Sequence, residues 1–128
     1  MRAPTAACAL AAAGGALGAL ARWGVAEALP SPGAGWPWAT LLVNLTGCLL
    51  MGVLLGLLTA GPEPAWVRPF LAVGVLGGYT TYSAFAVEVV ELTDAGRVLL
   101  AAGYVLASVL GGVLATAAGL LAVRRRTP

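Results

Sequence analysis

Four long apolar runs fill this chain and limit the folds that it can adopt. They lie at about residues 5–29, 38–58, 67–92 and 97–123. A helix needs roughly 20 apolar residues to cross the hydrocarbon core of a bilayer, and each run has that length. Only 9% of the residues are charged, whereas a soluble domain carries about 25%. The sequence therefore predicts one all-α membrane domain over residues 1–128, built from four transmembrane helices.

Short segments rich in proline and glycine separate the first three runs. Residues 30–33 read Pro-Ser-Pro-Gly, and residues 61–64 read Gly-Pro-Glu-Pro. Proline cannot continue a helix, so both segments are expected to be turns. Trp36, Trp38 and Trp66 lie at the edges of the runs, where amphipathic rings favour the headgroup region. Four spans joined in this way bring both termini to one side of the membrane.

Small residues recur at four-residue spacing in every run. The recurring residues are Gly14 and Gly18, Gly52 and Gly56, Gly74 and Gly78, and Gly111, Ala115 and Gly119. Faces of this kind let helix backbones approach closely in lipid. Because all four runs carry one, we expect tight packing within the chain and a dimer of chains.

The third run contains a segment that is poorly suited to hydrocarbon. Two adjacent glycines, Gly77 and Gly78, precede four residues with hydroxyl groups at positions 79–82 and then Ser83. Irregular backbone inside a bilayer is tolerated only where it is buried in protein or lines a water-filled path. We therefore predict a helix break over Gly77 to Thr81 and an ion site or permeation pathway beside it.

Polar side chains in the middle of the spans fall at helical spacings. They are Thr40, Asn44 and Cys48 in the second run, Tyr82 and Glu88 with the aromatic Phe85 between them in the third, and Tyr104, Ser108 and Thr116 in the fourth. Residues three or four apart share a helix face. Each span after the first therefore carries one polar face.

Each of these residues also has a simpler interpretation. Ser108 alone could bond the carbonyl of its own preceding turn, and Phe85 alone could be packing. Asn44 could join two helices or line a pore, because a carboxamide in hydrocarbon needs a partner. Three polar faces together with a broken helix favour a pathway.

The polar faces suit an anion better than a cation. Carboxamide, hydroxyl and loose backbone N–H groups are donors that can replace the hydration shell of an anion, and aromatic ring edges carry partial positive charge. A full positive charge would hold the anion too firmly, since conduction needs weak, multiple sites. Free carbonyls at a helix break do the reverse and hold cations. A structural cation beside an anion route is compatible with this pattern.

Three stretches of this chain resemble the Fluc (CrcB-like) fluoride channels. They are residues 14–22, 40–47 and 77–85, which read GGALGALAR, TLLVNLTG and GGYTTYSAF. Their order and the length of the chain extend the resemblance over essentially the whole sequence. The resemblance implies an antiparallel dimer of four-helix subunits with two separate pores and a break in the third helix.

The resemblance also assigns expected roles to individual residues. Fluoride is expected to pass Asn44, Tyr82, Phe85, Tyr104 and Ser108, with Thr40 on the Asn44 face. A sodium ion is expected at the dimer centre, on the backbone carbonyls of Gly77 and Thr80, with Arg22 at the subunit contact and helix end and Glu88 at the pore mouth. Two residues depart from the family pattern. Tyr82 stands where phenylalanine is usual, and Gly112 stands where another serine is frequent.

The arginines predict the orientation of the chain. Arg2, Arg68 and Arg124–Arg126 belong to the side of the termini, and Arg22 and Arg97 belong to the other side. An excess of arginine favours the cytoplasm, so the termini are expected there. A homodimer of opposed subunits requires near-balanced charge. The partner is therefore either a second copy of this chain or a homologous subunit of opposite bias.

The leading functional prediction is a passive fluoride channel in the cell membrane. The alternatives are a proton-coupled exporter of the small multidrug type, for which Glu27 is the only acidic candidate in the first span, and a non-conducting structural subunit. An enzyme is not expected, because without histidine or lysine no nucleophile–base pair can be assembled. Cys8 and Cys48 lack metal-ligand spacing and are expected to be buried thiols.

Overall fold

The computed structural model describes residues 3–29 and 35–125, and these residues form helices without strands. The elements are α1 (Ala3–Ala28), α2 (Trp38–Thr59), η1 (Arg68–Leu76), α3 (Gly77–Tyr79), α4 (Ser83–Asp94) and α5 (Val98–Arg124). Four helical stretches are long and apolar enough to cross a membrane: Thr5–Ala28, Trp38–Thr59, Arg68–Asp94 and Val98–Arg124. The all-α fold with four transmembrane helices is therefore confirmed. The expected turn at residues 30–33 lies outside the described residues.

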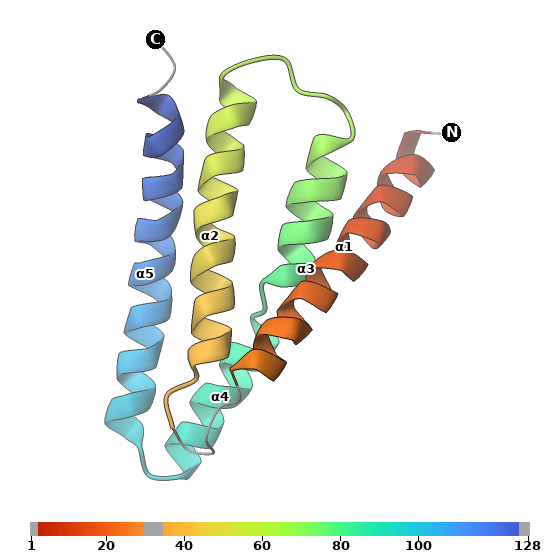
Figure 1. Cartoon of the computed structure of the whole chain (residues 1–128). Helices are drawn as coiled ribbons and strands as arrows, with labels where there is room; N and C mark the ends of the chain where they lie inside the picture. Colours follow the sequence, from red (N-terminus) through yellow and green to blue (C-terminus); the bar gives the residue numbers. More distant parts are fainter. Residues whose placement is uncertain (1–2, 30–34, 126–128) are drawn as a thin grey trace.

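The spans associate as two pairs. Helix α2 packs along α5, and α1 packs along η1 and α3. Figure 1 shows that the helices of each pair run in the same direction, and that α1 leans away from the α2–α5 pair toward its N-terminus. The first turn of α1 and the last turn of α5 lie toward the same end of the molecule, opposite the α4–α5 turn (Figure 1). The third span, made of η1, α3 and α4, belongs to the α1 pair through η1 and α3 and reaches α5 through α4.

Glycines allow the helix backbones in both pairs to approach each other closely. A Cβ atom built on Gly18 of α1 would overlap the Val75 carbonyl and lie 2.7 Å from the Tyr79 nitrogen. In the other pair, a Cβ on Gly52 would overlap the Thr116 carbonyl. Hydrogen at these positions allows one backbone to lie directly on another, as small-residue faces do in lipid. The small residues expected to make helix contacts therefore lie at contacts within the chain.

The third span changes geometry twice. In η1 the helix is a π-helix, and the Gly77 amide donates to the Ala72 carbonyl five residues earlier. The helix then continues through α3 and ends at Thr80, whose φ of −75° and ψ of 157° are extended. Prediction of a break beginning at Gly77 was therefore wrong, because Gly77 is helical with φ of −65° and ψ of −34°. The break occupies residues 80–82.

The reason lies in what Gly78 contacts. A Cβ on Gly78 would overlap the backbone carbonyl of Gly15 in α1. The glycine is thus required by helix packing and not by an unusual backbone conformation. Irregular backbone follows only after this contact ends, where hydroxyl side chains replace the small ones.

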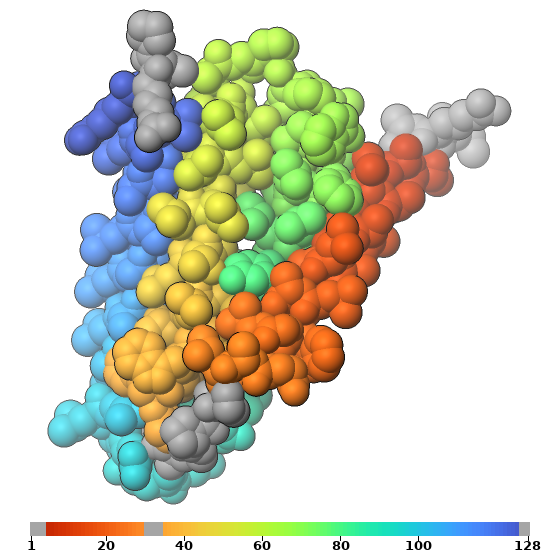
Figure 2. Space-filling view, viewed as in Figure 1, coloured from red at the N-terminus to blue at the C-terminus, as the bar shows by residue number. Residues whose placement is uncertain are grey.

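Few large side chains are buried inside the chain. The main cluster consists of Leu41, Leu92, Ala101 and the fully buried Tyr104. Many large apolar side chains face outward instead, among them Leu99 with 90% of its surface exposed. A helix bundle with an apolar exterior is adapted to lipid or to a partner subunit. Figure 2 shows the same molecule hollowed between α2 and η1, where Gly47, Ala72 and Gly77 are among the residues lining a hollow of about 180 Å³.

Candidate functional site

Asn44 of α2 faces the break in the third span. Its amide nitrogen donates to the Thr81 carbonyl at 2.9 Å, and its carbonyl oxygen accepts from the Thr81 amide at 2.8 Å. The carboxamide therefore satisfies both polar groups of one residue in the irregular backbone. Both interpretations of Asn44 had been left open, and the helix-joining one is confirmed by these bonds. Its side chain also lines a groove, described below.

The hydrogen bonds around Thr81 interrupt the helical ladder. In a continuous helix the Thr81 amide would donate to Gly77, and the Ala84 amide to Thr80. Here the Thr81 amide donates to Asn44, and the Ala84 amide donates to the Thr81 hydroxyl at 3.2 Å. The carbonyls of Gly77 and Thr80, which the resemblance assigns to a cation, therefore lose their helical partners, as do the carbonyls of the two residues between them.

Glu88 holds two of the predicted pathway hydroxyls. Thr40 donates to one carboxylate oxygen at 2.6 Å, and Tyr104 donates to the other at 2.6 Å. The three residues come from α2, α4 and α5, so this cluster ties three helices together. Glu88 also borders an open hollow with Ser83 and Glu91. A carboxylate in an apolar span needs donors of this kind, since an unpaired charge there is very unfavourable.

Four aromatic rings form a continuous row from the break to the end of the molecule with the α4–α5 turn. The ring centroids of Tyr82 and Phe85 are 5.9 Å apart, and those of Phe85 and Tyr104 are 5.2 Å apart. Trp36 continues the row at 5.9 Å from Tyr104, edge to face. The row places aromatic rings, whose edges are partly positive, at the contact of α4 with α5 and at the start of α2. Tyr82 is its exposed end, with 80% of its surface accessible.

A groove of about 330 Å³ brings together most of the predicted fluoride residues. It is lined by Asn44, Cys48, Thr80, Thr81, Tyr82, Phe85, Ser108 and Val109. The lining contains no acidic or basic side chain; it consists of a carboxamide, hydroxyls, a thiol, aromatic rings and the aliphatic side chain of Val109. Tyr104 and Thr40 do not line this groove. Their hydroxyls instead bind Glu88, next to it.

Ser108 contributes a buried hydroxyl to this part of the molecule. Its hydroxyl oxygen is fully buried and makes no hydrogen bond within the described part of the chain. The prediction that it could bond its own preceding turn is therefore wrong. A buried hydroxyl without a partner is unfavourable by about 1–3 kcal/mol, which a bound ion or water would relieve.

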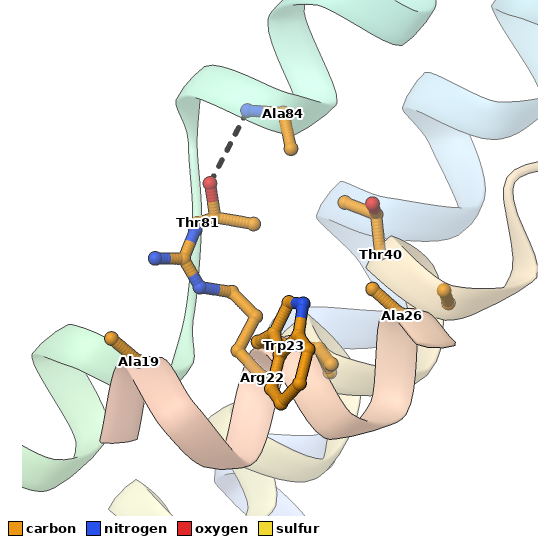
Figure 3. A pocket seen from close by; sticks show the side chains of 9 residues that line it. Ala19, Arg22, Trp23, Ala26, Thr40, Thr81 and Ala84 are labelled. Atoms are coloured by element: carbon orange, nitrogen blue, oxygen red, sulfur yellow. Dashed lines mark hydrogen bonds between the residues drawn. The ribbon is translucent and has the colours of Figure 1, made fainter. Parts of the chain in front are cut away.

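Arg22 lines a second hollow, of about 300 Å³, on the other side of Thr81. Figure 3 shows the Arg22 side chain reaching from α1 toward Thr81, beside Trp23 and across from Thr40. The backbone at Thr81 therefore separates this cationic hollow from the uncharged groove. Within the described residues, Arg22 makes no ion pair of the kind that joins Arg68 to Glu63.

Sequence reasoning missed the central position of Thr81. Its hydroxyl accepts from Ala84, and its peptide group binds Asn44. It also missed the contact of the Tyr79 and Thr46 hydroxyls at 2.9 Å, which joins α3 to α2. The signal was present in the run of hydroxyl residues at positions 79–82. Their individual partners depend on how the spans pack and cannot be read from spacing.

A metal site built from charged side chains is not found in the described residues. No group of three or more His, Cys, Asp or Glu residues lies close enough together there to hold a metal ion.

Comparison with known proteins identifies the family of the chain. The family model described as "CrcB-like protein, Camphor Resistance (CrcB)" matches residues 9–120. A fluoride-specific ion channel of Pseudomonas fluorescens is 50% identical over 113 residues, which cover 84% of this chain and 89% of the relative. One of Bordetella avium is 48% identical over 108 residues, 84% of each chain. One of Sphingopyxis alaskensis is 46% identical over 114 residues, 88% of this chain and 90% of the relative.

Proposed function

This chain belongs to the CrcB-like protein family, and we propose that it is a passive, fluoride-selective ion channel that exports cytoplasmic fluoride. The single observation that carries the proposal is the uncharged groove that unites Asn44, Tyr82, Phe85 and Ser108. Relatives named as fluoride-specific ion channels share almost half of its sequence or more over most of its length. The protein is a multi-pass membrane protein, and its membrane would be the cell membrane.

Fluoride would shed water in the groove and take donors in exchange. The unpaired hydroxyl of Ser108 is one such donor, and the ring edges of Tyr82 and Phe85 add partial positive charge. The Asn44 nitrogen has a second hydrogen beyond the one given to Thr81. None of these groups binds as firmly as a full charge, so the ion can leave as well as enter.

The direction of flow follows from acid–base chemistry and not from energy coupling. Neutral HF crosses lipid and dissociates in a neutral cytoplasm, which traps the anion inside. A passive pore then lets fluoride leave down its electrochemical gradient. No nucleotide-binding motif is present in the sequence, and the intramembrane carboxylate Glu88 is engaged by two hydroxyls.

We propose a sodium ion as the structural cofactor, bound at the dimer centre through the carbonyls of Gly77 and Thr80. The residues fit such an ion, because Asn44 and the Thr81 hydroxyl occupy the amides that would otherwise pair with these carbonyls. Neutral oxygen ligands suit a hard monovalent cation at a broken helix. The ion would brace the break, and no step of conduction is assigned to it.

The working unit is proposed to be an antiparallel dimer with two pores. The outward apolar faces support a partner, since Leu99, Leu114 and Val73 are exposed to 90%, 69% and 66%. The partner would be a second copy or a homologous subunit of opposite charge bias, with the termini of this chain in the cytoplasm. Arg22 would then face the subunit contact, and Glu88 would stand at the pore mouth.

A fluoride-electrode assay of efflux from liposomes tests the proposal. The chain is reconstituted alone and together with a homologous subunit of opposite charge bias. Fluoride efflux with no chloride efflux in either preparation is the expected result. Proton-coupled export of cationic drugs would support the multidrug alternative, whose one candidate carboxylate, Glu27, is exposed in the last turn of α1. Absence of any transport in both preparations would favour a structural subunit.

A further inference from the structure

Cys48 lies where three hollows of the molecule meet. It lines the groove that contains Asn44 and Phe85, the hollow that contains Gly77, and a third groove of about 560 Å³. The third groove runs along α5 and is lined by Cys48, Ser108, Val109, Gly112, Val113, Thr116 and Ala117. The first and third grooves share Cys48, Ser108 and Val109. Together they follow α2 and α5 from the helix break toward Thr116.

The two grooves meet at Cys48, Ser108 and Val109, and Gly112 lines the third groove next to the thiol. A Cβ built on Gly112 would lie 3.4 Å from the sulfur of Cys48, in ordinary contact. A methyl group at position 112 would therefore add bulk where the two grooves meet. Cys48 is half-buried and follows Asn44 by one helical turn on the same face.

Ser108 supplies an independent indication that something passes here. Its buried hydroxyl has no partner within the described residues, and it borders both grooves where they meet. We infer that Cys48 forms the waist of the ion pathway, so that the bulk of side chain 48 sets how fast fluoride moves from the Asn44 groove toward Thr116. This inference rests on the proposed channel function and adds a residue to its pathway.

The chain offers a matched thiol control, since Cys48 and Cys8 are its two cysteines. Cys8, on α1, is exposed. The variant Cys8→Ala keeps the thiol at the waist, and Cys48→Ala keeps the one on α1. Both are reconstituted in whichever assembly conducts fluoride and treated with methyl methanethiosulfonate. The thiolate attacks the sulfenyl sulfur, a Cys–S–S–CH3 disulfide forms and methanesulfinate leaves.

Modification is expected to lower fluoride efflux by roughly tenfold in Cys8→Ala and to leave Cys48→Ala unchanged. Reduction with dithiothreitol should restore the lost flux, which excludes unfolding as the cause. Mass spectrometry records the extent of labelling. Full labelling of Cys48 with unchanged flux would overturn the inference, and so would failure of the reagent to reach Cys48.

A second pair of variants tests the role of residue 48 by substitution alone, without chemical labelling. Gly112→Ala should lower the flux, because its methyl group would contact the Cys48 sulfur, and Cys48→Ala in the same chain should restore it. If restoration fails, residue 48 does not form the waist. If the unmodified protein conducts no fluoride at all, the proposed function itself fails. If the protein conducts fluoride but neither the labelling of Cys48 nor Gly112→Ala changes the flux, only the role of Cys48 is refuted.

Discussion

Asn44 and Thr81 pair as two peptide groups would, with the carboxamide of one residue bonded to both the N–H and the C=O of the other. The two distances are 2.8 and 2.9 Å, and the residues lie 37 positions apart in the sequence. The pair joins α2 to the break in the third span. It fixes the extended backbone at a point where no helical bond can do so.

Asn44→Asp should lower the rate of fluoride efflux by about a hundredfold or more. A carboxylate can still accept from the Thr81 amide, but it cannot donate to the Thr81 carbonyl, and its charge repels the anion. The initial rate of fluoride efflux from liposomes measures the loss.

Asn44→Ala separates the two causes. It removes the charge problem and keeps the structural one, so it should destabilise the protein by about 1–3 kcal/mol while retaining more flux than Asn44→Asp. Equal fluxes in the two variants would show that charge at position 44 is irrelevant. Normal flux in Asn44→Asp would remove Asn44 from the pathway.

Gly18→Ala should disrupt the α1–η1 contact. The added methyl would overlap the backbone at Val75 and Tyr79, and overpacking of this kind is unfavourable by about 1–3 kcal/mol. Thermal unfolding in detergent, followed by size-exclusion chromatography, should show a lower midpoint.

Gly24→Ala is the matched control on the same helix, because nothing lies within 4 Å of a Cβ built there. It should be neutral or slightly stabilising, since alanine is favoured over glycine inside a helix by up to about 1 kcal/mol. Identical behaviour of the two variants would mean that α1 does not pack on η1 as described.

The Tyr104–Glu88 bond should be worth more than an ordinary hydrogen bond. Because Tyr104 is fully buried and Tyr104→Phe would leave a Glu88 side-chain oxygen without its donor, the substitution should destabilise the protein by about 1–3 kcal/mol. The same change in a Glu88→Ala background should have much less effect, which a double-mutant cycle on unfolding midpoints measures. Tyr79→Phe, which removes a neutral contact with Thr46, serves as the smaller reference. Additive losses for positions 88 and 104 would contradict the bond.

The four spans could be predicted because a transmembrane helix must be apolar along its own length, whatever it packs against. The position of the break could not. Gly77 and Gly78 were interpreted as loose backbone, yet the spacing of Gly74 and Gly78 was also interpreted as a packing face. The second interpretation holds, since Gly78 lies against Gly15.

The hydrogen bonds between side chains of different helices could not be predicted from the sequence for a different reason. Thr40 and Glu88 are 48 positions apart and belong to different helices. Helical periodicity identifies the face of each residue but not the rotation of one helix against another. The resemblance places Thr40 and Tyr104 on the fluoride route, and the structure shows that both hydroxyls donate to Glu88.

Tyr82→Phe should leave fluoride flux within about twofold of the unmodified protein, a difference of less than 0.5 kcal/mol in barrier height. The ring of Tyr82 packs against Phe85 at 5.9 Å, and the substitution keeps that ring and its edge. The side chain is 80% exposed, so loss of the hydroxyl leaves no buried group unpaired. Tyr82→Ala, which removes the ring, should lower the flux far more, and Phe85→Ala should resemble it. A strong loss in Tyr82→Phe, measured in the same liposome assay, would instead make the hydroxyl a donor that fluoride requires.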